Sequence, residues 1–379
     1  MMQRRTYLQS LLYAGLGMLF PVSRLFADPA TDGDTYSVIL LGDTHFDTLP
    51  HTVYHGPYLT AYKDKPSIPH MDEFKRNGNM WKTLCPELIA AAGRQVTPDT
   101  RLAIQLGDLV QGDCGDPELH KKFLTDAWNL IKRSFPTVPF LPVCGNHDIR
   151  GKGARSAYDA VMPATLAKEL KQPVTRPTFF FRQGPDLFLF IDFNAPDIPV
   201  VREAFERHGD ARYIFVVTHG SVIPWDYGSY RWFLYGTDRE NALRREMLDL
   251  FLKRNVIVLN GHLHKLGFLE YATSAGTVTQ FMINSVFTGK ALEKPAVIAD
   301  TPERYGTLTK ALKPRKKGMS DEEARADYTA LMNEYKPGIK RFHYAKSAGF
   351  AKLIVSPKGV EARYYGGAGS EPIQTFTLR

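Results

Sequence analysis

The sequence predicts an α/β fold in which short buried strands alternate with helices. Short apolar runs recur from residue 36 to about residue 260, and segments with helical periodicity lie between them. Each apolar run ends in a polar cluster. This order is typical of β-α-β units, whose strands lie mostly parallel in one sheet.

The apolar runs and the helical patterns place the expected elements in chain order. The expected strands are Tyr36–Leu41, Arg101–Leu106, Phe140–Val143, Leu187–Ile191, Ile214–Thr218 and Val256–Asn260. The expected helices are Met80–Ala92, Pro117–Phe135, Ala157–Lys171, Val200–Arg207 and Arg239–Lys253. Hairpin-like interruptions are expected at Thr178–Arg182 and Phe268–Asn284. Asp116 stands before Pro117, an order that favours a helix N-cap.

The C-terminal part of the chain is expected to add one helix and several strands. Ser320 and Glu323 form a capping-box pattern at the start of a helix near Ser320–Tyr335. The expected strands are Gly349–Ser356, Glu361–Tyr365 and Ile373–Leu378. The stretch before the helix is expected to be irregular. Its basic run, Lys310–Lys317, is expected to be a solvated face, because no compact basic-aromatic module accompanies it.

Two segments are too long for simple connectors. Residues 46–78 form an insertion rich in His and Tyr that also contains four Pro, and residues 221–237 are rich in aromatic side chains. Loops of this size in compact domains commonly serve as binding surfaces or lids.

Composition places the chain among globular proteins. It has 379 residues, of which 44% are hydrophobic and 23% charged, and its net charge is +8. These values exclude a disordered, fibrous or disulfide-scaffolded protein. The three cysteines, Cys85, Cys114 and Cys144, allow one disulfide at most, and the sequence leaves open whether one forms.

The first 27 residues have the features of an export signal. Arg4 and Arg5 precede the apolar run Leu11–Phe20, and Leu25-Phe26-Ala27 supplies a relaxed cleavage site. The pattern around the paired Arg resembles a twin-arginine signal, which implies bacterial export to the periplasm or beyond. An ordinary secretory signal with a chance Arg pair is the alternative. The apolar run is too short to span a bilayer, so no stable membrane anchor is expected after cleavage.

Gly, Asp, Asn and His gather at the ends of the expected strands. The groups are Gly42-Asp43-Thr44-His45, Gly107-Asp108, Gly145-Asn146-His147-Asp148, Thr218-His219-Gly220 and Gly261-His262-Leu263-His264. The carboxyl ends of parallel strands lie along one edge of a sheet, where ligands bind. We therefore expect these side chains to form one site.

The side-chain types in this expected site favour metal chemistry. Carboxylate, carboxamide and imidazole groups suit Mn²⁺, Fe²⁺ or Zn²⁺, and no thiolate is among them. They are more numerous than one ion needs. Two divalent ions about 3.5–4 Å apart with one shared carboxylate would use them all, and a hydroxide that bridges the ions would attack phosphorus in line.

The complete series of strand-end motifs resembles the calcineurin-like metallophosphoesterase family over residues 36 to about 290. The resemblance implies two packed mixed β-sheets, a β-sandwich flanked by helices, instead of one parallel sheet. It implies that Asp43, His45 and His264 hold one metal, that Asn146, His219 and His262 hold the other, and that Asp108 bridges them. It also implies that His147 is the general acid for the leaving alkoxide, and Asp148 could orient His147.

One position departs from a neighbouring branch of the family. Purple acid phosphatases resemble this chain but have a metal-binding Tyr three positions after the second-motif Asp, where this chain has Gln111. The resemblance therefore implies two divalent ions instead of a ferric-tyrosinate site.

Further residues near the motifs are candidates for substrate binding. Arg150, Lys152 and Arg155 follow the third motif closely enough to bind a phosphate group. Trp225 and Tyr227 follow His219 and could stack on an organic group of the substrate, although aromatic side chains in such a loop also serve as packing.

These features together predict an exported hydrolase of small phosphoric esters. Residues 1–27 would be the export signal, residues 28–290 the metallophosphoesterase domain with its insertion at 46–78, and residues 291–379 a segment that completes or caps that domain. The large aromatic loops favour a phosphodiesterase, with a phosphomonoesterase of the same mechanism as the alternative. A non-catalytic secreted metal-binding protein is a third interpretation. No nucleic-acid partner is expected, and the sequence leaves the substrate, the metal pair and the oligomeric state open.

Overall fold

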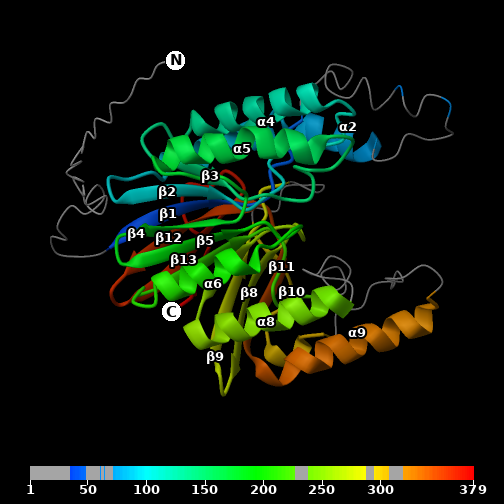
Figure 1. Ribbon diagram of the computed structural model, residues 1–379, viewed down its shortest axis with the longest axis vertical. Coiled ribbons are helices and arrows are strands. Elements are labelled where there is room, and N and C mark those ends of the chain that lie inside the picture. The colour runs from blue at the N-terminus through cyan, green and yellow to red at the C-terminus, as the bar shows by residue number, and fades with distance from the viewer. Residues whose placement is uncertain are drawn as a thin grey trace, which may run out of the picture.

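In the computed structural model, the strands form two packed sheets with helices on their outer faces (Figure 1). The structure describes residues 35–47, 60, 64, 71–226, 238–286, 294–306 and 319–379. The predicted leader, residues 48–59 of the insertion, residues 227–237 and the basic run Lys310–Lys317 lie outside the described residues. Among the described helices, none has the length and apolar character needed to cross a bilayer.

The first sheet has the strand order β14-β13-β12-β1-β2-β3. Its strands are β1 (Tyr36–Leu41), β2 (Thr100–Gln105), β3 (Phe140–Pro142), β12 (Gly349–Ser356), β13 (Gly359–Gly366) and β14 (Gln374–Thr377). Strands β1, β2 and β3 are parallel, whereas β12 is antiparallel to β1 and pairs Phe350 with Leu41. The sheet is therefore mixed.

The second sheet has the order β10-β11-β8-β9-β7-β6-β5-β4. Its strands are β4 (Phe179–Gln183), β5 (Asp186–Ile191), β6 (Ile214–Thr218), β7 (Ile257–Asn260), β8 (Leu266–Thr273), β9 (Gly276–Met282), β10 (Ala296–Ala299) and β11 (Ile339–Lys346). Strands β5, β6 and β7 are parallel, and β8 and β9 form an antiparallel hairpin. This arrangement confirms the two mixed sheets that the family resemblance implied, and the single parallel sheet suggested by periodicity alone was wrong.

The helices cover the two outer faces of the sandwich. Helices α2, α4 and α5 lie over the first sheet, and α6, α8 and α9 lie over the second (Figure 1). Their bounds, with that of α3, are α2 (Met71–Met80), α3 (Leu84–Arg94), α4 (Pro117–Lys132), α5 (Ala154–Leu170), α6 (Ile198–Arg207), α8 (Asp238–Arg254) and α9 (Asp321–Tyr335). Asp116 caps α4 by accepting a hydrogen bond from the N–H of Leu119, and Ser320 and Glu323 form the predicted capping box of α9.

The alternation of side chains along the strands builds three apolar layers. In β1, Val38 and Leu40 point into the core between the sheets, whereas Ile39 and Leu41 pack in the layer under the helices. Because successive side chains of a strand face opposite sides, a strand that is buried on both faces has an unbroken run of apolar residues in its sequence. This double burial is why β1 has the bounds that its sequence predicts.

Three expected features of the chain differ in the structure. The expected helix Met80–Ala92 is split, because α2 ends at Met80 and α3 begins at Leu84. Most of helix α2 lies in the segment 46–78, which was expected to be a long loop, and the helix ends two residues beyond that segment. Strand β10 lies in the stretch expected to be irregular, and β11 follows α9, where no strand was expected. Strand β11 forms because it pairs with β8, despite the polar side chains in its sequence.

The C-terminal segment supplies strands to both sheets. Strand β11 pairs with β8 in the second sheet, and β12 lies between β1 and β13 in the first. This placement puts β12 beside the strand that leads into the first motif. Cys85, Cys114 and Cys144 are buried and unpaired, so the structure contains no disulfide between them.

Candidate dinuclear metal centre

The structure brings the polar side chains at the strand ends into one cluster. Asp43 and His45 follow β1, Asp108 follows β2 and His219 follows β6, whereas His262 and His264 follow β7. The two sheets therefore contribute to the same site from the carboxyl ends of their parallel strands. Three groups of these side chains have ligand atoms within 4.8 Å of one another and could each hold a metal ion.

The first group joins β1 to β7. The Nε2 atom of His264 lies 2.9 Å from Oδ2 of Asp43 and 3.0 Å from Nε2 of His45. The backbone N–H of His262 donates to Oδ1 of Asp43 at 2.9 Å, which fixes the carboxylate. The ligand atoms of Asp43, His45 and His264, the three side chains that the resemblance assigns to the first ion, all lie within 4.8 Å of one another.

The second group lies around Asp108. The Nε2 atom of His219 lies 3.1 Å from Oδ2 of Asp108 and 3.1 Å from Nδ1 of His262. Nδ1 of His219 donates to the carbonyl of Leu106 at 2.7 Å, so Nε2 is the nitrogen that faces the site. Asp108 also lies 3.7 Å from Nε2 of His45, a member of the first group. Asp108 is therefore placed between the two groups, as a bridging ligand must be.

The buried oxygen of Asn146 tests whether this site fits a metal. Oδ1 of Asn146 is buried, and it has no hydrogen-bond partner among the described residues. A buried polar atom without a hydrogen-bond partner is energetically costly unless an ion, a water molecule or a ligand satisfies it. Together with two carboxylates and neutral imidazoles, this oxygen gives a nitrogen and oxygen donor set that suits borderline divalent ions.

The backbone of the motifs is strained in a way that brings the ligands together. His45, Asp108, His262 and His264 all have positive φ, between 43° and 76°. Such conformations cost energy outside glycine and cluster at functional sites. Gly261 has a related role, because a Cβ atom there would lie 2.3 Å from Oδ1 of Asp43. Only glycine permits this close approach.

Burial and charge set the protonation of the imidazoles. Burial lowers the pKa of His262 to about 3, and the nearby charge of His219 adds to this. Burial also lowers the pKa of His45 well below its ordinary value. For His219, burial acts in the same direction but the charge of Asp108 outweighs it, and the pKa rises to about 9. Two of these three side chains are thus neutral at pH 7, the form that binds metals.

His147 lies at the edge of the cluster. Its Nε2 atom is 4.0 Å from Oδ2 of Asp108, and its backbone N–H donates to Oδ1 of Asp108 at 2.7 Å. Nδ1 donates to the carbonyl of Gln111 at 2.9 Å, and Nε2 lies 3.0 Å from Nη1 of Arg150. Burial lowers the pKa of the ring, and the nearby charge of Asp108 opposes this.

Asp148 does not orient the His147 ring as the sequence suggested. Its carboxylate accepts hydrogen bonds from the backbone N–H groups of Val110, at 3.0 Å, and Gly145, at 2.8 Å. Burial raises the pKa of this carboxyl to about 7. Asp148 therefore shapes the turn that presents His147, whereas Gln111 and Arg150 hold the ring.

The expected substrate residues are spread over different surroundings. Arg150 is next to His147, and Lys152 is exposed on the turn before α5. Arg155 is held by Asp192, at 2.5 Å, and by Asp159, at 2.9 Å. These two carboxylates engage its guanidinium in ion pairs.

Trp225 is a core residue, which corrects the expectation that it contacts substrate. Its side chain is fully buried, and its ring stacks on Tyr344 with centroids 6.0 Å apart. The ring of Phe342, two residues before Tyr344 on β11, also lies against Trp225, with centroids 6.2 Å apart. Tyr227 lies outside the described residues.

The structure adds residues that the sequence did not mark. The ring of Phe193 lies 5.3 Å from that of His219 and 5.6 Å from that of His262, so it packs against two of the imidazoles. Glu73 of α2 contacts both Gln111 and Arg150. No local pattern identifies these residues, because their role depends on contacts between distant segments.

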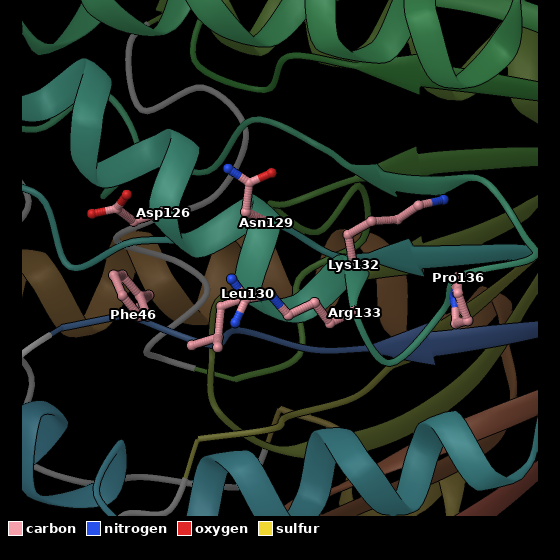
Figure 2. A pocket seen from close by; sticks show the side chains of 7 residues that line it. All are labelled: Phe46, Asp126, Asn129, Leu130, Lys132, Arg133 and Pro136. Carbon is pink, nitrogen blue, oxygen red and sulfur yellow. The ribbon is translucent and has the colours of Figure 1, made fainter.

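A separate pocket of about 570 Å³ lies along α4 (Figure 2). None of the expected ligands lines it, although Phe46 directly follows His45. Its lining residues are Phe46, Asp126, Asn129, Leu130, Lys132, Arg133 and Pro136.

Comparisons with known proteins agree with this arrangement. The family model described as calcineurin-like phosphoesterase matches residues 36–266. No curated protein sequence matches the chain. Among solved structures, the chain is similar to a purple acid phosphatase, PPD1, from yellow lupin (Lupinus luteus) seeds, with a TM-score of 0.51 and 12% identity over 90% of this chain and 53% of that one. The chain thus spans about half the length of the lupin protein, and the likeness shows the fold alone.

Two further solved structures match the chain at lower similarity. The structure of PhoD has a TM-score of 0.47 and 12% identity, and the match covers 93% of this chain and 70% of that one. A dimetal phosphatase from Danio rerio has a TM-score of 0.46 and 10% identity over 90% of this chain and 98% of that one.

Proposed function

The chain belongs to the calcineurin-like phosphoesterase family, and from this premise we propose that it is a metal-dependent hydrolase of phosphoric esters. The position of the Asp108 carboxylate supports this proposal most directly. Its Oδ2 atom lies near His45, a member of the group with Asp43 and His264, and near His219, which lies beside His262.

Two divalent ions fit the donor set of this site. Asp43, His45 and His264 would hold one, Asn146, His219 and His262 would hold the other, and Asp108 would be shared. When bound, such a pair supplies positive charge for the phosphoryl oxygens and makes water a nucleophile near neutral pH. Mn²⁺, Fe²⁺ and Zn²⁺ are the ions that these donors suit.

His147 is the side chain placed to move a proton. Hydrolysis breaks the bond between phosphorus and the ester oxygen of the leaving group, and that oxygen must take up a proton. An imidazole donates well near neutral pH. Because a guanidinium only donates hydrogen bonds, Nε2 of His147 accepts from Arg150 in the structure and can carry a proton only after Arg150 moves to another acceptor. A phosphoryl oxygen is such an acceptor.

The class of ester is part of the proposal. The aromatic segment after His219 favoured a phosphodiesterase, but the burial of Trp225 in the core removes one of the rings on which that preference rested. A specific observation favours the phosphomonoesterase as a second candidate. Nη1 of Arg150 lies 3.0 Å from Nε2 of His147, where it could donate a hydrogen bond to the additional non-bridging oxygen that a monoester has and a diester lacks.

Metal analysis combined with a panel of esters tests the proposed function. Purified protein should contain about two divalent ions per chain and should hydrolyse p-nitrophenyl phosphate or bis(p-nitrophenyl) phosphate. Removal of the metal with a chelator should stop turnover, and Mn²⁺, Fe²⁺ or Zn²⁺ should restore it. Failure to hydrolyse either ester in any metal form would support a non-catalytic metal-binding protein instead. The ratio of kcat/KM for the two esters decides between diesterase and monoesterase.

We also propose export through the signal at residues 1–27. The paired Arg4 and Arg5 before an apolar run support the twin-arginine route. A reporter fused after residue 35 should reach the bacterial periplasm, and replacement of both Arg by Lys should block this. Export that persists in the Lys variant would support an ordinary secretory signal.

A further inference from the structure

The guanidinium of Arg150 is held in place on three sides. Its Nε lies 2.5 Å from Oδ2 of Asp113, and its Nη2 lies 3.3 Å from Oε2 of Glu73. Nη2 also donates to the carbonyl of Gln111 at 3.4 Å. The remaining nitrogen, Nη1, faces Nε2 of His147 at 3.0 Å. Nη1 is thus the nitrogen of Arg150 that points toward the ligand cluster.

Glu73 connects this guanidinium to α2. Its Oε2 atom accepts a hydrogen bond from Nε2 of Gln111 at 3.1 Å as well as the contact from Arg150. Oε1 of Gln111 accepts in turn from Nδ2 of Asn77, one turn further along the same helix. Gln111 and Asn77 are both fully buried. The buried amides fix the position of α2 relative to the turn after β2, and so they fix the carboxylate of Glu73.

The charges around Arg150 indicate what it can do. Glu73 and Asp113 together offset its positive charge, so Arg150 adds little net attraction for an anion. The carboxylates instead determine its direction, since a guanidinium has its donors in a fixed planar fork. With Nε and Nη2 engaged, only Nη1 is available to a group in the site. A donor held in one orientation loses less entropy on binding than a free side chain.

We propose that Glu73 is a positioning residue which, through Arg150, directs Nη1 toward a non-bridging oxygen of the phosphate ester. This inference rests on the proposed function. When the ester binds, Nη1 exchanges Nε2 of His147 for the phosphoryl oxygen, while Nε and Nη2 stay on their carboxylates. The same movement frees Nε2 of His147 to carry the proton for the leaving group. Helix α2, most of which lies in the segment 46–78, thereby contributes to substrate binding although it carries none of the proposed metal ligands.

Four variants of the full-length protein separate this role from a merely structural one. Glu73→Gln keeps the size of the side chain but removes its charge. Glu73→Asp keeps the charge but shortens the side chain by one methylene group. Asp72→Asn removes the same charge from the adjacent exposed position of α2 and serves as the matched control. Arg150→Ala removes the group through which Glu73 is proposed to act. Inorganic phosphate, which has the non-bridging oxygens of a phosphate ester without its organic group, is the probe for binding.

The proposal predicts a separation between binding and turnover. Glu73→Gln should raise KM and the inhibition constant of inorganic phosphate about tenfold, and kcat should change by less than about threefold, the pattern expected when an interaction is lost equally in ground and transition states. Glu73→Asp should have an intermediate effect, and Asp72→Asn should match the wild type. In the Arg150→Ala background, Glu73→Gln should add less than about twofold, because the two residues act as one unit.

Two results would overturn the proposal. One is an unchanged phosphate inhibition constant in folded Glu73→Gln, and the other is a full additional loss in the Arg150→Ala background. If Glu73→Gln does not fold, the same two criteria apply to Glu73→Asp. A wild-type protein that neither hydrolyses an ester nor binds phosphate would instead contradict the proposed function, so the two failures are distinguishable.

Discussion

The Nε2 atom of His219 lies 3.1 Å from the Oδ2 atom of Asp108, and both side chains are almost completely buried. Nδ1 of His219 already donates to the carbonyl of Leu106. A second proton on the ring therefore lies on Nε2, between the imidazole and the carboxylate. Burial acts against this proton, but the charge of Asp108 outweighs it and raises the pKa of His219 to about 9.

This proton predicts a pH dependence of metal binding. Because the metal-free site holds a proton on His219 below about pH 9, a metal that binds Nε2 must displace it. We expect release of about one proton per His219-bound ion at pH 7.5, and an affinity for Zn²⁺ or Mn²⁺ that increases up to tenfold per pH unit between pH 7 and 9. Titration calorimetry in two buffers of different ionisation enthalpy measures the proton release.

The control for this titration is His219→Ala, in which the proton release should be smaller by about one. Binding of Zn²⁺ to the wild type that is independent of buffer identity at pH 7.5 would contradict the prediction.

His147 and His264 should differ in what they contribute. His264 lies 2.9 Å from Oδ2 of Asp43, so we expect His264→Ala to lose metal and turnover together. His147→Ala should keep its metal and lose activity by about 10²- to 10⁴-fold, the usual contribution of a general acid. Metal content by elemental analysis and kcat for an ester with a poor leaving group measure the two effects.

The position of His147 makes this comparison decisive. Its Nε2 lies 4.0 Å from Oδ2 of Asp108 and could also be read as a ligand. Loss of one metal ion in His147→Ala would assign it to the metal centre, whereas full activity with full metal content would remove the general-acid role. An ester with a good leaving group, which needs little protonation, should be less affected by the substitution.

Gly261 should be required for the first metal group. An added Cβ atom would lie 2.3 Å from Oδ1 of Asp43, a distance that side chains do not tolerate, so the carboxylate must move. We expect Gly261→Ala to weaken metal binding at least tenfold. Gly209→Ala is the matched control, because its Cβ atom would meet the flexible end of Arg254, at 3.2 Å, and the backbone oxygen of Phe205 at an ordinary van der Waals distance of 3.7 Å. Equal metal affinities of the two variants would show that a methyl group at position 261 does not displace the carboxylate of Asp43 from the metal site.

Local patterns in the sequence predict the buried strands well, but they do not predict which strands pair. The bounds of β1, β6 and β12 agree with the apolar runs, because both faces of these strands are buried and the signal is local. The pairing of β12 with β1 joins segments far apart in the chain, and periodicity has no information about it. The same reason explains why β11 was not predicted. Its polar side chains interrupt the apolar pattern of a strand, and the strand forms because it pairs with β8.

The clustering of the candidate ligands could be predicted because each follows a strand closely. Asp43 and His219 are fixed in space once the strands before them are fixed. Glu73 differs, because its contact with Arg150 depends on how α2 packs against the turn after β2. Trp225 illustrates the opposite error, since an aromatic side chain after a ligand has the same local pattern whether it lines a site or, as here, stacks on Tyr344 in the core.

His120 should make the protein less stable in mild acid. The ring is buried in α4, and its Nε2 donates to the carbonyl of Asp148 at 2.7 Å, which fixes the tautomer of the neutral ring. Its Nδ1 is buried without a hydrogen-bond partner among the described residues. Burial lowers the pKa of the ring below its ordinary value of 6.5, and the hydrogen bond to Asp148 and the charge of Asp113 only partly oppose this.

The sign of the effect follows from proton binding. Below pH 6.5 His120 is protonated in the unfolded chain, whereas in the folded protein it is protonated only at lower pH. The unfolded state therefore binds more protons in this range, and the free energy of unfolding decreases as the pH falls. We expect the free energy of unfolding of the wild type to fall relative to His120→Gln by up to about 1.4 kcal/mol per pH unit below 6.5, and the difference to be constant between pH 7 and 8. Urea unfolding of both proteins at pH 5, 6, 7 and 8 measures it. Because all other groups contribute equally to the two proteins, parallel curves over the whole range would mean that His120 is protonated in the folded state as readily as in the unfolded one.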